Sequence, residues 1–113
     1  MYSVAFIFQP GELDNEFYAL DHEIERFAES LDGFVGKEVW HSADNRTINS
    51  TYYWRDEASL KTFSRYRKHL QAKKDYQRWY QGFHIVVSKV ERSYGDGTID
   101  HFTPNTRDKP TRR

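Results

Sequence analysis

YYWRDEASLKTFSRYRKHLQAKKDYQRWYQGFHIVVSKVERSY, residues 52–94, is the stretch that decides the fold. It opens on aromatic strand residues, continues through basic helical sequence and closes on an apolar, β-branched run. Asp56 is a good helix N-cap, because its carboxylate can accept orphan backbone amides. Apolar side chains recur behind it at helical spacing, namely Leu60, Phe63, Tyr66 and Leu70. We expect this helix to bend or break before a second piece ending near Tyr80, and Gly82 to precede a strand over residues 83–94.

The N-terminal half predicts the remaining elements. Residues 2–8 are aromatic and β-branched, which indicates a strand that Pro10 and Gly11 end with a turn. From Leu13 onward, apolar residues fall on one helical stripe, namely Phe17, Leu20, Ile24, Phe27 and Leu31. Gly33 then provides a C-terminal stop for the helix. Residues 34–42 and 47–54 read as the two strands of a hairpin, turned by residues 44–46.

The resulting order is β-α-β-β-α-β, which is the order of ferredoxin-like α+β folds with an antiparallel sheet. We expect one domain over residues 1–95. Residues 96–113 form a polar tail with several Thr and Arg residues, and we expect it to be flexible or to wrap a partner.

The first and last strands are apolar on both of their alternating faces. In the first strand Phe6 and Phe8 alternate with Ala5 and Ile7, and the last strand repeats the pattern. When helices cover one face of a sheet, the second face contacts water and is expected to be polar. We therefore expect a homodimer packed sheet to sheet. The alternative is ordinary strand propensity in a monomer.

Composition narrows the functional classes. The chain has 113 residues, 17% of them aromatic, and no cysteine, so its core is built from aromatic rings and not from disulfides or thiolate-bound metal. It shows no signal peptide and no apolar run of about 20 residues, so we expect a soluble, cytoplasmic protein. The net charge is zero, with acidic residues in the first helix and basic ones in the second. An isolated basic helix is more often a solvated face, so neither nucleic acid nor membrane is expected as a partner.

Short motifs along the chain resemble the antibiotic biosynthesis monooxygenase domain family. They are DGFVG at 32–36, YWRDEASL at 53–60, HLQAK at 69–73, WY at 79–80 and VERSYG at 90–95. The resemblance spans most of residues 2–95. It implies a dimeric α+β barrel, in a family that includes cofactor-independent oxygenases of phenolic or quinol-like substrates, haem-degrading enzymes and members of no established role.

Strand parity locates a candidate site. Ser50, Tyr52 and Trp54 share one face of their strand, and a second set, Phe34, Gly36, Glu38 and Trp40, shares one face of the preceding strand. We expect an aromatic cavity between sheet and helices that suits a flat ligand. A cofactor-independent oxygenase needs such a pocket, a proton acceptor and donors that stabilise an anion. The catalytic candidates are Trp54, His69 and Ser50, and the substrate-binding candidates are Tyr52, Trp40, Phe63 and Trp79.

Each candidate also has a purely structural explanation. We favour a core anchor for Trp79, with its indole N–H bonded outward, and weigh both roles equally for Trp54. His69 lies in a basic helix, where an exposed or capping imidazole is the default, but it matches the helix histidine of the family. The other histidines, His22, His41, His84 and His101, lack the paired spacing of a metal site, so no metal or cofactor is expected.

Departures from the family leave three functional classes open. Quinone-forming members carry an asparagine four residues before the strand-end tryptophan, where this chain has Ser50. Haem-degrading members use a first-strand asparagine and a helix tryptophan; this chain has Phe6, Phe8 and Phe63 there, which argues against haem cleavage. The sequence thus predicts a monooxygenase or quinol oxidase acting on a small aromatic compound. The alternatives are a non-catalytic module that binds an aromatic metabolite or haem, and a structural dimer.

Overall fold

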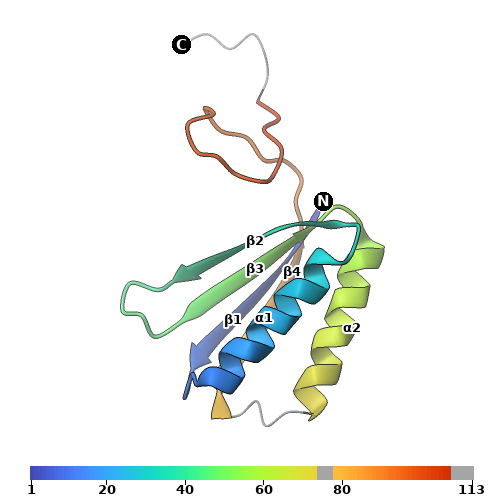
Figure 1. Ribbon diagram of the computed structural model, residues 1–113. Helices are drawn as coiled ribbons and strands as arrows, with labels where there is room; N and C mark the ends of the chain where they lie inside the picture. Colours follow the sequence, from blue (N-terminus) through green and yellow to red (C-terminus); the bar gives the residue numbers. More distant parts are fainter. Residues whose placement is uncertain (74–77, 108–113) are drawn as a thin grey trace.

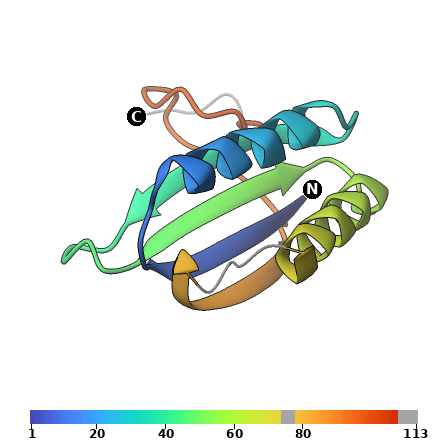
Figure 2. The ribbon, with the colours of Figure 1, turned by 60° about the horizontal axis from the view of Figure 1, so that its bottom comes forward.

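The computed structural model describes residues 1–73 and 78–107, without the side chains of 69–73. Its elements are β1 (Tyr2–Pro10), α1 (Asn15–Glu29), β2 (Phe34–His41), β3 (Ile48–Trp54), α2 (Glu57–Lys73) and β4 (Tyr80–Lys89). The sheet has the order β2-β3-β1-β4 with antiparallel neighbours, and both helices lie on one of its faces (Figures 1 and 2). The predicted ferredoxin-like β-α-β-β-α-β order is confirmed.

Aspartate caps begin both helices. Asp14 Oδ1 accepts a hydrogen bond from the backbone N–H of Phe17 at 3.0 Å, and Asp56 Oδ1 accepts one from Ser59 at 2.7 Å. Each carboxylate thereby satisfies an amide that has no partner within the helix. The N-cap predicted for Asp56 is confirmed, and the same signal marks Asp14.

Gly33 has a different role from the predicted one. Helix α1 ends at Glu29, and Ser30 caps it in a right-handed conformation. Gly33 lies where α2 begins, and a Cβ atom there would come within 2.5 Å of Ser59 Oγ. The Gly33 amide donates to that hydroxyl at 3.2 Å, and its carbonyl accepts from the amide of Arg55 at 2.7 Å. The glycine is required by this close approach and is not a helix stop.

The β2–β3 hairpin turns as expected. Asn45 takes a positive φ of 60°, a conformation that asparagine tolerates. Asp44 Oδ1 accepts hydrogen bonds from the Ser42 hydroxyl at 2.7 Å and the Arg46 amide at 3.0 Å. The local chemistry of residues 44–46 therefore supplies the turn.

A register shift at the start of β2 corrects the predicted parity. Phe34 pairs with Trp54 and Gly36 pairs with Tyr53, so one extra residue lies between two neighbouring pairs. A bulge of this kind moves every following side chain to the other face. Phe34 therefore faces the helices, whereas Gly36, Glu38 and Trp40 face away from them. The prediction that these four residues share one face is wrong.

The bounds of β4 also differ from expectation. The strand runs from Tyr80 to Lys89 and includes Gly82. Its pairs with β1 extend from Pro10↔Tyr80 to Tyr2↔Lys89, so the length of the partner strand sets both ends. The prediction of helix up to Tyr80 is wrong at that residue, and residues 74–77 lie outside the described part of the chain.

The core under the helices consists of two aromatic-rich clusters. The first contains Val4, Ile24, Ala28, Tyr52, Trp54, Leu60 and Phe63. The second contains Phe6, Phe8, Phe17, Trp79 and Tyr80. Both clusters use the helix-facing side of β1 and the predicted stripe of α1. The helix-covered face is thus the buried face of the sheet.

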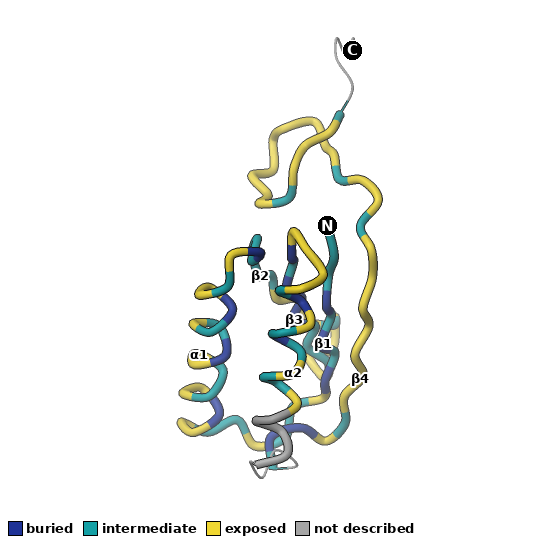
Figure 3. Tube along the Cα trace, turned by 90° about the vertical axis from the view of Figure 1, so that its right-hand side faces the viewer, coloured by how far each residue is buried: buried dark blue, intermediate teal, exposed yellow. Residues whose placement is uncertain are grey.

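The other face of the sheet, which we call the open face, has no helix over it. Figure 3 shows β4 at the edge far from α1, exposed along most of its length. Residues 90–107 leave β4 near the end of the sheet where β1 begins (Figure 1), and within them His101 and Phe102 return to the open face beside Glu38 and Tyr53. The loop of residues 90–107 is closed by hydrogen bonds between Ser93 and Thr106 and between Gly95 and Asn105.

Candidate functional site

Strand β3 brings three of the predicted site residues to the helix-covered face. Ser50, Tyr52 and Trp54 are buried there, and the side chain of Tyr52 is only 1% exposed. Phe63 of α2 packs against two of them, with ring centroids 4.6 Å from Tyr52 and 4.9 Å from Trp54. The structure therefore places Ser50, Tyr52, Trp54 and Phe63 in one layer, as the sequence predicts.

Two polar atoms in this layer lack partners. Tyr52 Oη and Trp54 Nε1 are buried, and neither has a hydrogen-bond partner among the described residues. Leaving a buried donor unpaired costs about 1–3 kcal/mol. Such atoms in a folded protein require an explanation, and a catalytic role or a bound water or ion is among those commonly found.

Trp79 lies in the other cluster, next to Phe17, with ring centroids 6.1 Å apart. Its indole N–H donates to Asp14 Oδ1 at 3.0 Å, and the Arg78 guanidinium lies 5.0 Å from its ring centroid. The hydrogen bond to Phe17 lowers the pKa of the Asp14 carboxyl, and Trp79 and Arg78 lower it further. These contacts match the core anchor favoured for Trp79.

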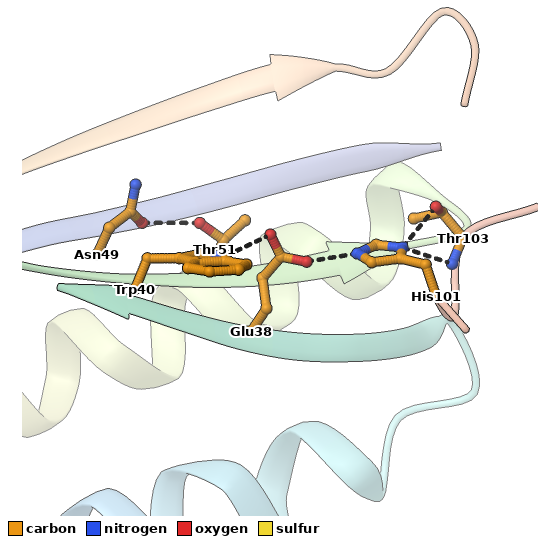
Figure 4. Close-up of polar contacts among 6 residues, drawn as sticks. All are labelled: Glu38, Trp40, Asn49, Thr51, His101 and Thr103. Atoms are coloured by element: carbon orange, nitrogen blue, oxygen red, sulfur yellow. Dashed lines mark hydrogen bonds and ion pairs between the residues drawn. The ribbon is translucent and has the colours of Figure 1, made fainter. Parts of the chain in front are cut away.

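Trp40 lies on the open face, away from Tyr52 and Trp54. It is 66% exposed, and its indole N–H donates to Glu38 Oε2 at 2.9 Å. Figure 4 shows both side chains on the side where the tail reaches the sheet, with His101 beside Glu38. The prediction that Trp40 lines a cavity under the helices is corrected by the bulge in β2. His69 belongs to α2, but its side chain lies outside the described residues.

The same bulge turns Lys37 toward the helices, a position that strand parity alone does not predict. Its ammonium pairs with Asp21 at 3.5 Å and Glu25 at 3.6 Å, and its side chain is 11% exposed. It lies 5.3 Å from the centroid of the Tyr52 ring. Burial would lower the pKa of Lys37, but Tyr52, Asp21 and Glu25 outweigh that effect and raise it.

Arg67 is a second cation on the helix-covered face that was not among the predicted site residues. Its guanidinium carbon lies 4.3 Å from the centroid of the Phe6 ring and 6.0 Å from that of Phe63. Among the described residues, no carboxylate is within ion-pair distance of Arg67. Its position four residues after Phe63 was the available signal, since side chains at that spacing share a helix face.

Two buried phenols lie within the electrostatic influence of Arg67. Burial raises the pKa of Tyr52, against the opposing charges of Lys37 and Arg67. Burial likewise raises the pKa of Tyr80, while Arg67 opposes the rise by its charge and a hydrogen bond. Both hydroxyls therefore remain neutral donors at physiological pH. Lys37 acts on Tyr52 through its charge and not through a well-aligned hydrogen bond.

The helix-covered face thus combines packed aromatic rings, neutral hydroxyl and indole donors and two cations. Among the described residues, no group of three His, Asp or Glu side chains could hold a metal ion. In the same part of the chain, no helix is both long enough and apolar enough to cross a membrane. Donors and cations of this kind can stabilise negative charge on an aromatic molecule. The hollows described in the structure lie elsewhere, along the tail and outside α1 and α2 near Phe27 and Tyr66, so the predicted cavity between sheet and helices stays a prediction.

A comparison with protein-family models matches residues 8–88 to the family described as monooxygenase af470-like. The chain belongs to this family. The match confirms the resemblance to the antibiotic biosynthesis monooxygenases at the level of a related monooxygenase family. A search of curated proteins finds no match to this monooxygenase af470-like chain.

Solved structures share the fold of this family member at low sequence identity. Rv0793 from Mycobacterium tuberculosis has a TM-score of 0.66 and 14% identity, covering 83% of this chain and 98% of its own. A variant of SnoaB, a cofactor-independent oxygenase from Streptomyces nogalater, has a TM-score of 0.65 and 12% identity, covering 81% and 94%. A Deinococcus radiodurans protein classed with the antibiotic biosynthesis monooxygenases has a TM-score of 0.59 and 14% identity, covering 84% and 97%. At these identities the likeness concerns the fold.

Proposed function

We propose that this monooxygenase af470-like protein is a cofactor-independent monooxygenase or quinol oxidase that acts on a small phenolic compound. The observation that carries the proposal is the pair of buried, unpartnered donors, Tyr52 Oη and Trp54 Nε1, in the aromatic layer of a monooxygenase-family chain. SnoaB, which shares the fold, is a cofactor-independent oxygenase and supports the same reaction type.

The reaction needs only the substrate, oxygen and groups that handle a proton and an anion. The substrate loses a proton to His69, and the anion that remains forms a carbon–oxygen bond with O₂. Protonation gives a hydroperoxide. Its O–O bond then breaks as the same ring carbon loses its one hydrogen as a proton, which leaves a quinone carbonyl group and one molecule of water. Tyr52, Trp54 and Ser50 stabilise the anion by hydrogen bonds, and Phe63 forms a wall of the pocket.

Oxygen uptake by the metal-stripped protein tests this function. We expect saturable uptake with hydroquinones, anthrones or catechols above the autoxidation measured without protein. Trp54→Phe should lower the rate by about a hundredfold, the effect of losing one preorganised donor. Trp40→Phe is the matched control, because Trp40 lies on the open face. Uptake that never exceeds autoxidation would contradict the proposal and favour a non-catalytic binding module.

We also propose that two copies associate through their open faces, in the cytoplasm, as the sequence predicts. Val86 and Ile7 face that side, and Val86 is 39% exposed. On the helix side of the sheet, β4 also exposes apolar side chains, namely Phe83, Ile85 and Val87. A monomer that leaves both faces of an edge strand apolar exposes surface typical of an interface.

Sedimentation equilibrium of Val86→Glu tests the association. A charge buried at an interface without a partner should weaken it strongly, so we expect a monomer where the parent chain is a dimer. Tyr18→Glu, a change at an exposed position of α1, is the matched control and should stay dimeric. A monomeric parent chain would refute the association.

A further inference from the structure

Arg67 occupies an unusual place for a guanidinium. It is half-buried and lies over the ring of Phe6, at 4.3 Å from the centroid, in the layer that contains Tyr52. Favourable cation–π contact explains why the cation is tolerated there. The cation–π contact does not take the place of an ion pair, because guanidinium groups in apolar surroundings normally pair with a carboxylate or a phosphate.

The neighbouring cations show the contrast. Lys37 pairs with Asp21 and Glu25, and Arg78 pairs with Asp14 at 3.2 Å and Glu16 at 3.5 Å. Each of them is thus neutralised by two carboxylates. Within residues 1–73 and 78–107, Arg67 has no such partner. Of these cations, Arg67 is therefore the one without a carboxylate partner in the described part of the chain.

The groups around Arg67 would also accept an oxyanion. Tyr52 contributes a buried hydroxyl that has no described partner, and Tyr80 contributes a second hydroxyl beside the guanidinium. Phe6 and Phe63 supply flat apolar surface. A planar cation, hydroxyl donors and aromatic walls together match an aromatic ring that carries one negatively charged oxygen.

We propose that Arg67 binds the anionic oxygen of the substrate, so that the site selects phenolates over neutral aromatic molecules. This inference rests on the proposed function and names its substrate class. On binding, the O–H bond of the phenol breaks, the proton passes to solvent, and the electron pair stays on the oxygen beside Arg67. The anion is the form that reacts with O₂, so the charge that binds the substrate also activates it.

Binding of 4-nitrophenol tests the proposal without any turnover, because the dye changes colour when it ionises. We expect the dye to ionise more readily when bound, by tenfold or more in its ionisation constant, as an adjacent opposite charge would cause. Arg67→Gln should remove this change and weaken binding of the phenolate by about tenfold to a hundredfold. Arg65→Gln, at an exposed position on the same helix, is the matched control and should bind like the parent chain.

4-Nitroanisole separates charge recognition from a structural role. This ether has nearly the same shape but cannot ionise, so Arg67→Gln should bind it as well as the parent chain does. Equal losses for the phenol and the ether would show that Arg67 only supports the pocket and would overturn the proposal. No binding of 4-nitrophenol to the parent chain would overturn it as well.

Two further arms keep the outcome decisive. If Arg67→Gln does not fold, Arg67→Lys takes its place as a variant that retains the positive charge. The proposal still requires that the dye ionise more readily when bound to the parent chain than when free in solution. Failure of the proposed function is seen separately, as absent oxygen uptake while Arg67-dependent phenolate binding persists. Oxygen uptake with unchanged dye binding in Arg67→Gln would refute the role of Arg67 alone.

Discussion

The two faces of the sheet use similar residues to different ends. Tyr52 and Tyr53 are neighbours in β3, yet Tyr52 lies buried under the helices, whereas Tyr53 packs against Phe102 of the tail with ring centroids 5.3 Å apart. Trp54 and Trp40 differ in the same way. Strand parity, and not residue type, decides which aromatic side chains lie under the helices.

Polar groups follow the same division. On the helix-covered face, Lys37 and Tyr52 are held by burial and by charges on α1. On the open face, Glu38 Oε1 lies 2.5 Å from Nε2 of His101, a residue of the tail (Figure 4). Burial makes the first set expensive to disturb, whereas solvent screens the second.

The largest expected effect separates the two tryptophans. Trp54→Ala removes a fully buried ring that packs against Phe34 and Phe63, so it should lower the free energy of unfolding by about 3–5 kcal/mol. Trp40→Ala removes a ring that is exposed in the single chain, so it should change the free energy of unfolding of the monomer by at most about 0.5 kcal/mol. Urea unfolding measures both. Similar values for the two variants would mean that the open face is as closely packed as the covered one.

Most of the fold could be predicted because its signals are local. The Asp56 cap, the stripe of α1 and the turn at Asn45 all depend on residues that are near one another in sequence. The same is true of the parity that places Ser50, Tyr52 and Trp54 together.

The missed features depend on contacts between distant residues. The bulge after Phe34 is defined by its pairing with β3, and it exchanges Trp40 for Lys37 on the helix-covered face. The ends of β4 are set by β1 in the same way. Arg67 belonged to a basic run that reads as a solvated face, and only the packing of α2 on Phe6 shows that it turns inward.

An intermediate effect is expected from Lys37→Met, which removes a charge that burial and ion pairs hold on the covered face. At neutral pH it should lower the free energy of unfolding by about 1 kcal/mol, because Asp21 and Glu25 are partly exposed and regain water. The pKa values of Lys37 and Tyr52 are both raised by folding. Their contribution is therefore complete below about pH 10, the ordinary range of both groups, and is lost as pH rises through the folded-state values.

Chemical denaturation between neutral and alkaline pH measures this dependence. The loss of stability with rising pH should be smaller in Lys37→Met than in the parent chain, since one of the two groups is gone. Lys61→Met is the matched control, because Lys61 forms only an exposed pair with Glu57. The assignment fails if both methionine variants show the same alkaline dependence.

The smallest effect belongs to the open face, at the contact between Glu38 and His101. Glu38→Gln removes the charge from that contact, and both side chains are partly exposed, so stability should change by less than about 0.5 kcal/mol. Phe102, which lies over Gly36 and against Tyr53, still holds the tail after this change. Hydrogen exchange of residues 93–106 should therefore accelerate only slightly in Glu38→Gln and clearly in Phe102→Ala. The reverse order would mean that a polar contact, and not aromatic packing, fixes the tail on the open face.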